Sequence, residues 1–435
     1  MKLLITNGRV VDPANKIDSV NDILVENGKV ARVAPKIRVS GKKKSNLRVI
    51  DVRGKVVMPG AIDMHAHLRE PGYEEKETIY SGTRAAASGG ITSICCMPNT
   101  YPVIDNQTAV EFIMLKAQKE GAVNVFPVGA ITKNLSGEEL TEIAELKRAG
   151  VVAISDDGNA VANSRIMHLA LKYAKMFSLP VISHCEDVNL SKSGVMNAGY
   201  TATLLGLRGI PSEAEEIMVI RDIILARSAE AHLHVTHVSC RESVKFIREA
   251  KRQNIHVTCD TAPHYFTLTE EVVKEYAYNT NTKVNPPLRT TEDVKAIKEG
   301  LKDGTIDCIA SDHAPHTQEE KAKDYESAPF GIIGLETLLP LIFTELVHPK
   351  ILSLQEAVAK VTVNPARVLN LPNKGRLSVG ADADITIVDL EKEFIYEKVV
   401  SKSKNTPFLG RKFRGCVVMT IVGGKIVFQD GKLLL

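Results

Sequence analysis

The chain has 435 residues, of which 44% are hydrophobic and 25% charged, and its net charge is +3. The length suggests two or three domains, or one large barrel with a smaller partner, and the composition is ordinary for a globular enzyme. The small charge argues against binding to nucleic acid or to an anionic membrane. No apolar run approaches the length of a membrane span, and the first residues lack the apolar core of a signal peptide, so we expect a cytoplasmic protein. The seven cysteines form no C-x-x-C pair and are expected to be reduced and buried.

Residues 1–58 are predicted to form the N-terminal part of a β domain. Short apolar strands are expected at residues 3–5 and 22–25, and Asn7-Gly8 and Asn27-Gly28 are typical of hairpin turns. The basic stretch from Lys36 to Arg48 is interpreted as a solvated hairpin tip. It resembles a phosphate-binding loop only weakly, because Lys36 stands where that motif needs glycine.

From residue 59 to about residue 365, short β-branched runs alternate with helical stretches, which indicates repeated β-α units and a parallel sheet. Eight strands with intervening helices predict a (β/α)8 TIM barrel, an α/β fold whose catalytic groups project from the C-terminal ends of the strands. The predicted strands are 61–68, 91–97, 123–129, 151–155, 180–184, 233–238, 255–260 and 306–311. Predicted helices include 138–149, 165–177, 214–229, 241–253 and 291–303.

Residues 366–435 return to β character. Strands are predicted at 383–388 and 417–422, with turns at Gly423-Gly424 and Asp430-Gly431. We expect this segment and residues 1–58 to pair into one small β-sandwich domain beside the barrel.

Ionisable side chains stand at or just past the ends of five predicted strands. His65 and His67 lie two residues apart and therefore share one face of the first strand. Later strands end at Asp156-Asp157, His184, His237 and Asp312. Nitrogen and oxygen ligands of this kind suit zinc, with iron, manganese or cobalt as lesser options. Six ligands suit two ions that share a bridging carboxylate.

Each of these residues also has a plain structural interpretation. His184 could be a core histidine, Asp156-Asp157 could form a turn, and only one face of the strand carrying His232, His234 and His237 can look into the barrel. The occurrence of such residues at five strand ends together favours a metal site.

The chain resembles the dihydroorotase family of the amidohydrolase superfamily nearly from end to end. The resemblance implies metal-dependent, reversible cyclisation of N-carbamoyl-L-aspartate to dihydroorotate in de novo pyrimidine biosynthesis. Aspartate transcarbamoylase and a second copy of the chain are the partners to consider. The segments that carry the resemblance are Asp63–Gly72, Met97–Thr100, Ser155–Gly158, His184–Asp187, Asn285–Arg289, Asp312–His316 and Pro329–Gly331.

The resemblance also implies roles for the ionisable residues. One metal would be held by His65, His67 and Asp312, the other by His184 and His237, with Asp157 as the bridging ligand. Much of the superfamily bridges its metals with a carboxylated lysine at the end of the fourth strand, whereas residues 151–158 contain no lysine. We therefore expect one or two Zn²⁺ ions per subunit. Asp312 would be the catalytic base and acid that moves a proton between the attacking hydroxide and the amide nitrogen.

Substrate contacts follow from charge and from the same resemblance. Arg69 can grip a substrate carboxylate through a bidentate guanidinium pair. Asn99 and His316 are similar to the family's other contacts on the carboxylate side, and His67 also faces the substrate. Asn285, Phe330 and Gly331 would line the pyrimidine ring.

Two other functions compete with this hypothesis. An allantoinase or dihydropyrimidinase typically keeps the bridging lysine, and its substrate lacks the ring carboxylate that Arg69 is placed to meet. A non-catalytic homologue that scaffolds aspartate transcarbamoylase usually loses metal ligands, whereas here every expected ligand position is filled.

Overall fold

The computed structural model describes residues 2–39 and 47–434. Eight parallel strands form a nearly closed barrel in the order β15-β14-β13-β10-β9-β8-β7-β6. The edge strands approach each other at Ala66 and His313, where the His67 amide donates to the His313 carbonyl at 2.8 Å. All eight predicted strands are confirmed. They are β6 (Ala61–Ala66), β7 (Ile91–Cys96), β8 (Asn124–Gly129), β9 (Ala153–Ser155), β10 (Val181–Ser183), β13 (Leu233–Val235), β14 (Val257–Thr261) and β15 (Cys308–Ile309).

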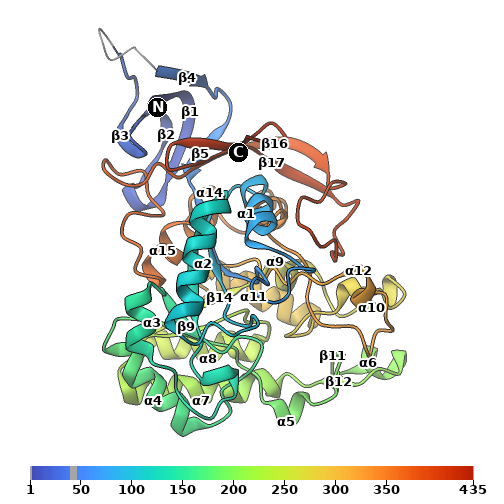
Figure 1. The fold of residues 1–435 in the computed structure, drawn as a ribbon. Coiled ribbons are helices and arrows are strands. Elements are labelled where there is room, and N and C mark those ends of the chain that lie inside the picture. The colour runs from blue at the N-terminus through green and yellow to red at the C-terminus, as the bar shows by residue number, and fades with distance from the viewer. Residues whose placement is uncertain (1, 40–46, 435) are drawn as a thin grey trace.

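Helices surround this barrel (Figure 1). The longer ones are α1 (Ile79–Ser88), α2 (Gln107–Glu120), α3 (Ile143–Ala149), α4 (Ser164–Lys175), α7 (Glu213–Ala229), α8 (Arg241–Arg252) and α11 (Thr291–Asp303). Sequence signals explain their limits. Thr290 and Asp293 form a capping box at the start of α11, and α8 buries Val244, Ile247 and Ala250 on one face.

The predicted helix 138–149 is wrong in its first turn, because α3 begins only at Ile143. The preceding residues fold back on the end of β8. The Thr141 amide donates to the Ile131 carbonyl at 3.0 Å and the Thr141 hydroxyl to the Ala130 carbonyl at 2.8 Å. These bonds and the bridge between Thr132 and Leu140 tie the segment to the residues after β8, so the helix begins only beyond it.

Shorter elements complete the barrel. A two-stranded sheet of β11 (Met196–Asn197) and β12 (Gly209–Ile210) projects from it, as Figure 1 shows. The short helices are α5 (Val188–Ser191), α6 (Tyr200–Leu205), α9 (Pro263–Thr267), α10 (Val272–Glu275), α12 (Gln318–Lys321), α13 (Leu338–Ile342), α14 (Leu354–Lys360) and α15 (Val363–Val368), with a π turn at Phe343–Val347 and 3₁₀ turns at Pro13–Asn15, Lys133–Leu135 and Thr280–Thr282.

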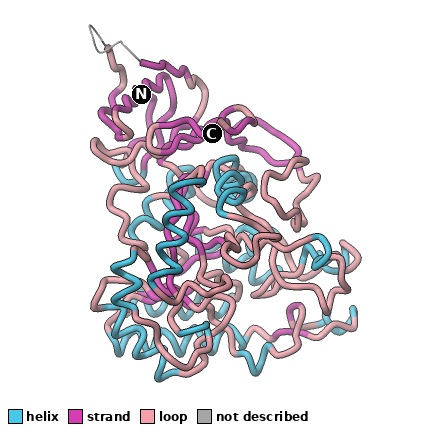
Figure 2. Tube along the Cα trace, viewed as in Figure 1, coloured by secondary structure: helices cyan, strands magenta, loops and turns pink. Residues whose placement is uncertain are grey.

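Both ends of the chain join one nine-stranded sheet, which Figure 2 shows as the strand-rich region beside the barrel. The pairing of β5 with β16 links the N-terminal to the C-terminal segment, as predicted from their β character. The strands are β1 (Lys2–Asp12), β2 (Ile17–Glu26), β3 (Lys29–Ala34), β4 (Leu47–Asp51), β5 (Val56–Pro59), β16 (Ile385–Ile395), β17 (Lys412–Val422), β18 (Lys425–Gln429) and β19 (Lys432–Leu433).

The turn predicted at Asn7-Gly8 is wrong, because both residues lie inside β1, where its pairing with β2 shifts register. Val57 of β5 explains the glycine, since a Cβ on Gly8 would lie 2.6 Å from its Cγ2. The turns at Asn27-Gly28, Gly423-Gly424 and Asp430-Gly431 are confirmed.

Most of the predicted hairpin tip at Lys36–Arg48, residues 40–46, falls outside the described residues. The strands on either side pair elsewhere, β3 with β2 and β4 with β1.

Apolar side chains close the barrel at the N-terminal end of its strands. Ile62 near the start of β6 donates its amide to the Val361 carbonyl at 2.8 Å, just before α15. Val368 and Leu369 pack with Ile62 in one buried cluster. We call this closed end the floor and the opposite, C-terminal end of the strands the rim. None of the helices in the described part of the chain has the length and apolarity needed to cross a bilayer.

Candidate metal centre

The six side chains predicted as metal ligands meet at the rim. They fall into two groups, and within each group one ligand atom per residue lies within 4.8 Å of the others. All six residues are buried. The first group is His65, His67 and Asp312, and the second is Asp157, His184 and His237.

In the first group, two imidazoles face one carboxylate. Asp312 Oδ1 lies 3.5 Å from His65 Nε2 and 3.6 Å from His67 Nε2. Both histidines use the other ring nitrogen for a contact with the protein. His65 Nδ1 lies 2.7 Å from Thr236 Oγ1, and His67 Nδ1 lies 2.8 Å from Asn99 Oδ1. Such contacts orient an imidazole so that its Nε2 is available to a metal.

Asp157 lies between the two groups. Its Oδ2 is 3.3 Å from His65 Nε2 and 3.4 Å from His67 Nε2, while its Oδ1 is 3.6 Å from His237 Nε2 and 3.7 Å from His184 Nδ1. One carboxylate oxygen therefore faces each group, which is the arrangement a bridging ligand needs. Asp156 points elsewhere, as its position beside Asp157 predicted, and accepts the amides of Ile131 and Thr132.

In the second group, His184 Nδ1 and His237 Nε2 lie 2.8 Å apart. His184 Nε2 contacts Glu186 Oε2 at 2.8 Å, and the same oxygen accepts a hydrogen bond from Asn285 Nδ2 at 2.9 Å. Glu186 therefore fixes the orientation of a candidate ligand and of a candidate substrate contact together.

Two of the facing atoms lack partners in the described part of the chain: His65 Nε2 and Asp157 Oδ1 are buried without a hydrogen bond. Leaving such atoms unpaired costs about 1–3 kcal/mol each. Nitrogen and oxygen donors that converge and stay unpaired fit a divalent cation in this cluster.

Electrostatics point the same way. Burial opposes the charged form of each group, yet His65 and its neighbours lower the pKa of Asp157 well below its usual range. Against the same burial, the nearby His67 imidazole and the charge of His65 lower the pKa of Asp312 to about 2. The carboxylates of Asp157 and Asp312 raise the pKa of His65 to about 10, although burial alone would lower it. Two ionised, buried carboxylates need positive charge beside them, which a protonated His65 or a divalent cation can supply.

Sequence reasoning missed the residue that supports this cluster from behind. Asp260 at the end of β14 accepts the His237 amide at 2.7 Å and the Thr236 hydroxyl at 3.0 Å, and contacts His234 Nε2 at 2.8 Å. His234 is thereby a structural histidine and His237 a rim histidine. The signal was present, because Asp260 closes the predicted strand 255–260.

The candidate substrate contacts form a second layer around the rim. Arg69 Nη2 lies 3.5 Å from His316 Nε2, and Arg69 Nε donates to the Pro315 carbonyl at 3.2 Å. His316 Nε2 donates to the Phe330 carbonyl at 2.8 Å. The Gly331 amide donates to the Lys283 carbonyl at 2.8 Å. Gly331 has φ 127°, and a Cβ there would lie 2.7 Å from Ala314 Cβ, so no other residue fits easily.

Family models match most of the chain. The model described as Dihydro-orotase-like matches residues 54–243, and the model of the Amidohydrolase family matches residues 267–428. The chain is 58% identical to a dihydroorotase of Endomicrobium trichonymphae, over 99% of this chain and 100% of the relative. It is 55% identical to a dihydroorotase of Pelotomaculum thermopropionicum, over 99% of each chain.

Solved structures of related folds cover the whole chain. The L-hydantoinase (dihydropyrimidinase) of Arthrobacter aurescens superimposes with a TM-score of 0.88 at 28% identity, covering 100% of this chain and 97% of that one. The dihydropyrimidinase of Brevibacillus agri gives 0.87 at 25% identity, covering 100% and 96%. These matches confirm the amidohydrolase-type barrel. Given full-length relatives that share more than half of its residues, the chain belongs to the dihydroorotase family.

Proposed function

We propose that this chain catalyses the metal-dependent, reversible cyclisation of N-carbamoyl-L-aspartate to dihydroorotate. The observation that carries the proposal is the pair of ligand groups joined by Asp157, with Arg69 and His316 beside them at the same rim. The dihydroorotases that share more than half of this chain's residues support the same reaction.

We propose that His65, His67 and Asp312 hold one metal ion and His184 and His237 a second, with Asp157 between them. The buried, unpaired His65 Nε2 and Asp157 Oδ1 support this assignment. Nitrogen and carboxylate donors favour zinc among the divalent metals. A bound ion would supply a Lewis acid and lower the pKa of water to about 7.

Asp312 is the residue we assign to proton transfer. Its low pKa keeps the carboxylate ionised at neutral pH, so it can accept a proton. In the hydrolytic direction Asp312 takes the proton of the attacking water and delivers it to the ring nitrogen as the amide bond breaks. In cyclisation it removes the proton from the carbamoyl nitrogen, which attacks the side-chain carboxyl carbon. That proton and a second one from solvent go to the carboxyl oxygen, which leaves as water.

Arg69, His316 and Asn99 are assigned to the substrate carboxylate, and Asn285, Phe330 and Gly331 to the ring. The short distance between Arg69 and His316 supports one shared anion site. Guanidinium and carboxylate pair through two parallel hydrogen bonds, which fixes the ring relative to Asp312. His67 also faces this space, since its Nε2 points toward Asp312.

Hydantoinases and dihydropyrimidinases share the fold, so a cyclic amidase with a neutral ring substrate is the second candidate. Two features weigh against it. Residues 151–158 lack the lysine that typically bridges the metals of those enzymes, and Arg69 offers a cation that a neutral ring does not need.

We also propose the domain limits 1–58, 59–365 and 366–435, a reducing cytoplasmic setting, and aspartate transcarbamoylase as a partner. The free state of all seven cysteines supports the compartment. The end of β5 at Pro59 and the start of β6 at Ala61 support the first domain limit.

The test offers the purified, zinc-loaded protein dihydroorotate, N-carbamoyl-L-aspartate, allantoin and dihydrouracil, with and without aspartate transcarbamoylase. We expect turnover of the first two substrates only. Faster turnover of allantoin or dihydrouracil than of dihydroorotate would replace the proposal by the second candidate. A chain inactive on all four substrates, even with the transcarbamoylase, would favour a non-catalytic scaffold.

A further inference from the structure

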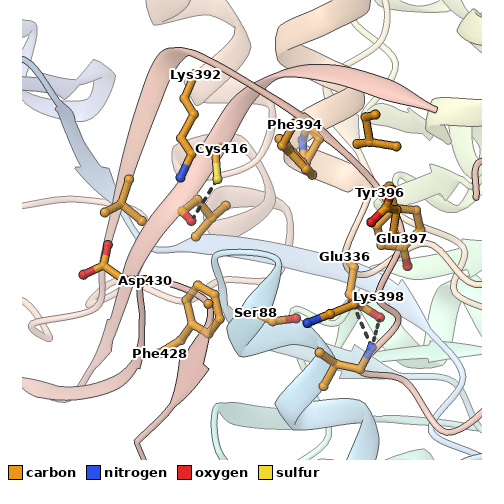
Figure 3. A pocket seen from close by; sticks show the side chains of 16 residues that line it. Ser88, Glu336, Lys392, Phe394, Tyr396, Glu397, Lys398, Cys416, Phe428 and Asp430 are labelled. Atoms are coloured by element: carbon orange, nitrogen blue, oxygen red, sulfur yellow. Dashed lines mark hydrogen bonds between the residues drawn. The ribbon is translucent and has the colours of Figure 1, made fainter. Parts of the chain in front are cut away.

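A segment of the C-terminal region, residues 400–405, crosses from the terminal sheet to the rim of the barrel. We call it the strap. Glu336 holds its first residues, because its carboxylate accepts the Val400 amide at 2.9 Å and the Ser401 amide at 3.1 Å. Glu336, Tyr396 and Lys398 line a pocket of about 420 Å³, and none of the six candidate metal ligands is among its lining residues. Figure 3 shows the side chains that line this pocket.

The middle of the strap is bonded to the loop that carries Arg69. The Ser401 hydroxyl donates to the buried carboxylate of Glu77, and the Ser403 hydroxyl donates to the Lys76 carbonyl at 2.6 Å. Glu77 also contacts His313 Nε2 at 3.3 Å. The strap is thus hydrogen-bonded to Lys76 and Glu77, and Glu77 connects it to His313 after β15.

Asn405 ends the strap between two candidate substrate loops. Its side-chain Oδ1 accepts the His316 amide at 3.1 Å, and its Nδ2 donates to the carbonyls of Ala314 and Gly331, each at 3.0 Å. The Asn405 carbonyl accepts the Ile333 amide at 2.9 Å. Asn405 is 4% exposed, so water does not compete for these bonds.

We propose that Asn405, a residue outside the barrel, is a positioning residue that sets substrate affinity by holding His316 and Gly331 in register. The inference rests on the proposed function, because those two residues are assigned there to the carboxylate and the ring. One planar amide satisfies both loops at once, and no apolar side chain can replace its donor and its acceptor. Without the Asn405 side-chain amide, the His316 amide and the Gly331 carbonyl can shift relative to each other. A shift of a fraction of an ångström in these residues is enough to weaken substrate binding.

The chain offers a matched control on the same strap. Ser403 is also buried and also bonds a loop backbone, but it reaches Lys76 rather than His316 or Gly331. Asn405→Ala removes all three side-chain bonds. Asn405→Asp keeps the shape of the side chain and the acceptor oxygen, but it replaces the Nδ2 donor by an oxygen that faces the carbonyl oxygens of Ala314 and Gly331. It therefore tests the same hydrogen bonds without creating a cavity.

The experiment measures kcat and KM for dihydroorotate and for N-carbamoyl-L-aspartate, together with bound metal, in the zinc-loaded wild type and in Asn405→Ala, Asn405→Asp and Ser403→Ala. We expect KM to rise at least tenfold in both Asn405 variants, kcat to fall less than KM rises, and metal content to stay at the wild-type value. Ser403→Ala should keep KM within twofold of wild type.

The inference is overturned if either folded Asn405 variant keeps KM within twofold of wild type, or if Ser403→Ala raises KM as much as they do. Loss of bound metal in the Asn405 variants also overturns it, because the effect would then run through Asp312. A wild-type chain that turns over neither substrate refutes the proposed function itself, and the inference with it.

Discussion

Two aspartates flank strand β15 and serve opposite ends of the barrel. The carboxylate of Asp307 at the floor has hydrogen-bond partners: its Oδ2 accepts from the Cys259 amide at 2.9 Å and from the Lys251 ammonium at 2.6 Å. Asp312 at the rim has a left-handed backbone, φ 49°, and its nearest ring nitrogens are 3.5 Å and 3.6 Å away. Those distances are too long for good hydrogen bonds. Asp307 therefore stabilises the fold at the floor, whereas the Asp312 carboxylate at the rim is placed to meet a ligand.

The same contrast extends to the neighbours of each aspartate. At the floor, Ile62, Val368 and Leu369 pack into one buried cluster. At the rim, His65 Nε2 and Asp157 Oδ1 are buried and unpaired within the described residues. Since packing supplies stability and unpaired polar groups detract from it, changes at the two ends should separate stability from activity.

The largest effect is expected from Asp312→Ala. Because the variant loses the assigned proton carrier and a proposed metal ligand, turnover of dihydroorotate should fall at least a thousandfold, roughly 4 kcal/mol of barrier. Its midpoint of urea unfolding should stay near that of the wild type. The floor control is Asp307→Ala, which should lower the midpoint and keep turnover. Activity above a few per cent in Asp312→Ala would contradict the assignment.

Leu369→Ala tests the floor from the apolar side. Leu369 is 2% exposed, and truncating a buried leucine costs about 2–5 kcal/mol. The free energy of unfolding, measured in urea, should drop by that amount while KM for dihydroorotate stays unchanged at a temperature where the variant is folded. A rise in KM without loss of stability would show that the two ends are not separable.

Arg69→Lys sharpens the description of the rim. Lysine keeps the charge but loses the planar fork, so KM for dihydroorotate should rise about tenfold, roughly 1.4 kcal/mol, with a smaller change in kcat. Arg84→Lys is the matched control, since Arg84 donates to the carbonyls of Tyr80 and Glu120 on α1 and α2, away from the ligand groups. Equal KM values for the two variants would remove Arg69 from the carboxylate site.

A smaller effect concerns Lys321, which donates to the carbonyls of Pro329 and Gly331 near the rim. Burial, with the charge of Lys283, lowers the pKa of Lys321 to about 7. Between pH 7 and about 10 the unfolded chain therefore holds more protons at this residue, and stability should rise with pH. The gain from pH 7 to pH 9 should be about 1–2 kcal/mol.

Urea unfolding at pH 7, 8 and 9 measures this gain. Lys321→Met has no titrating group there, so its unfolding free energy should rise less over the same range. If the unfolding free energies of the variant and the wild type change equally with pH, the buried Lys321 ammonium does not destabilise the folded chain at pH 7.

The sequence predicts the barrel well because each strand is a short apolar run followed by a polar residue. His65 and His67 share a strand face by spacing alone, and Asp312 and His237 follow apolar strands. The helix start at Ile143 and the bulge at Gly8 could not be predicted, because distant contacts decide them: Thr141 with Ile131, and Gly8 with Val57.

The convergence of the six side chains could be predicted from the sequence, whereas the residues that support them could not. The position of Asp157 between two groups, with one oxygen facing each, depends on how β9 sits beside the other strands. The link from Asn405 to His316 joins segments 89 residues apart and leaves no local pattern.

The most direct test measures bound metal and turnover on the same sample. The wild type is stripped with a chelator, assayed with dihydroorotate, reloaded with zinc and assayed again, beside Asp157→Asn and Asp312→Ala. We predict that stripping abolishes turnover, that zinc restores it, and that both variants bind less metal than the wild type. Undiminished turnover by the metal-free wild type, or full metal content in both variants, would contradict a metal centre built from these six side chains.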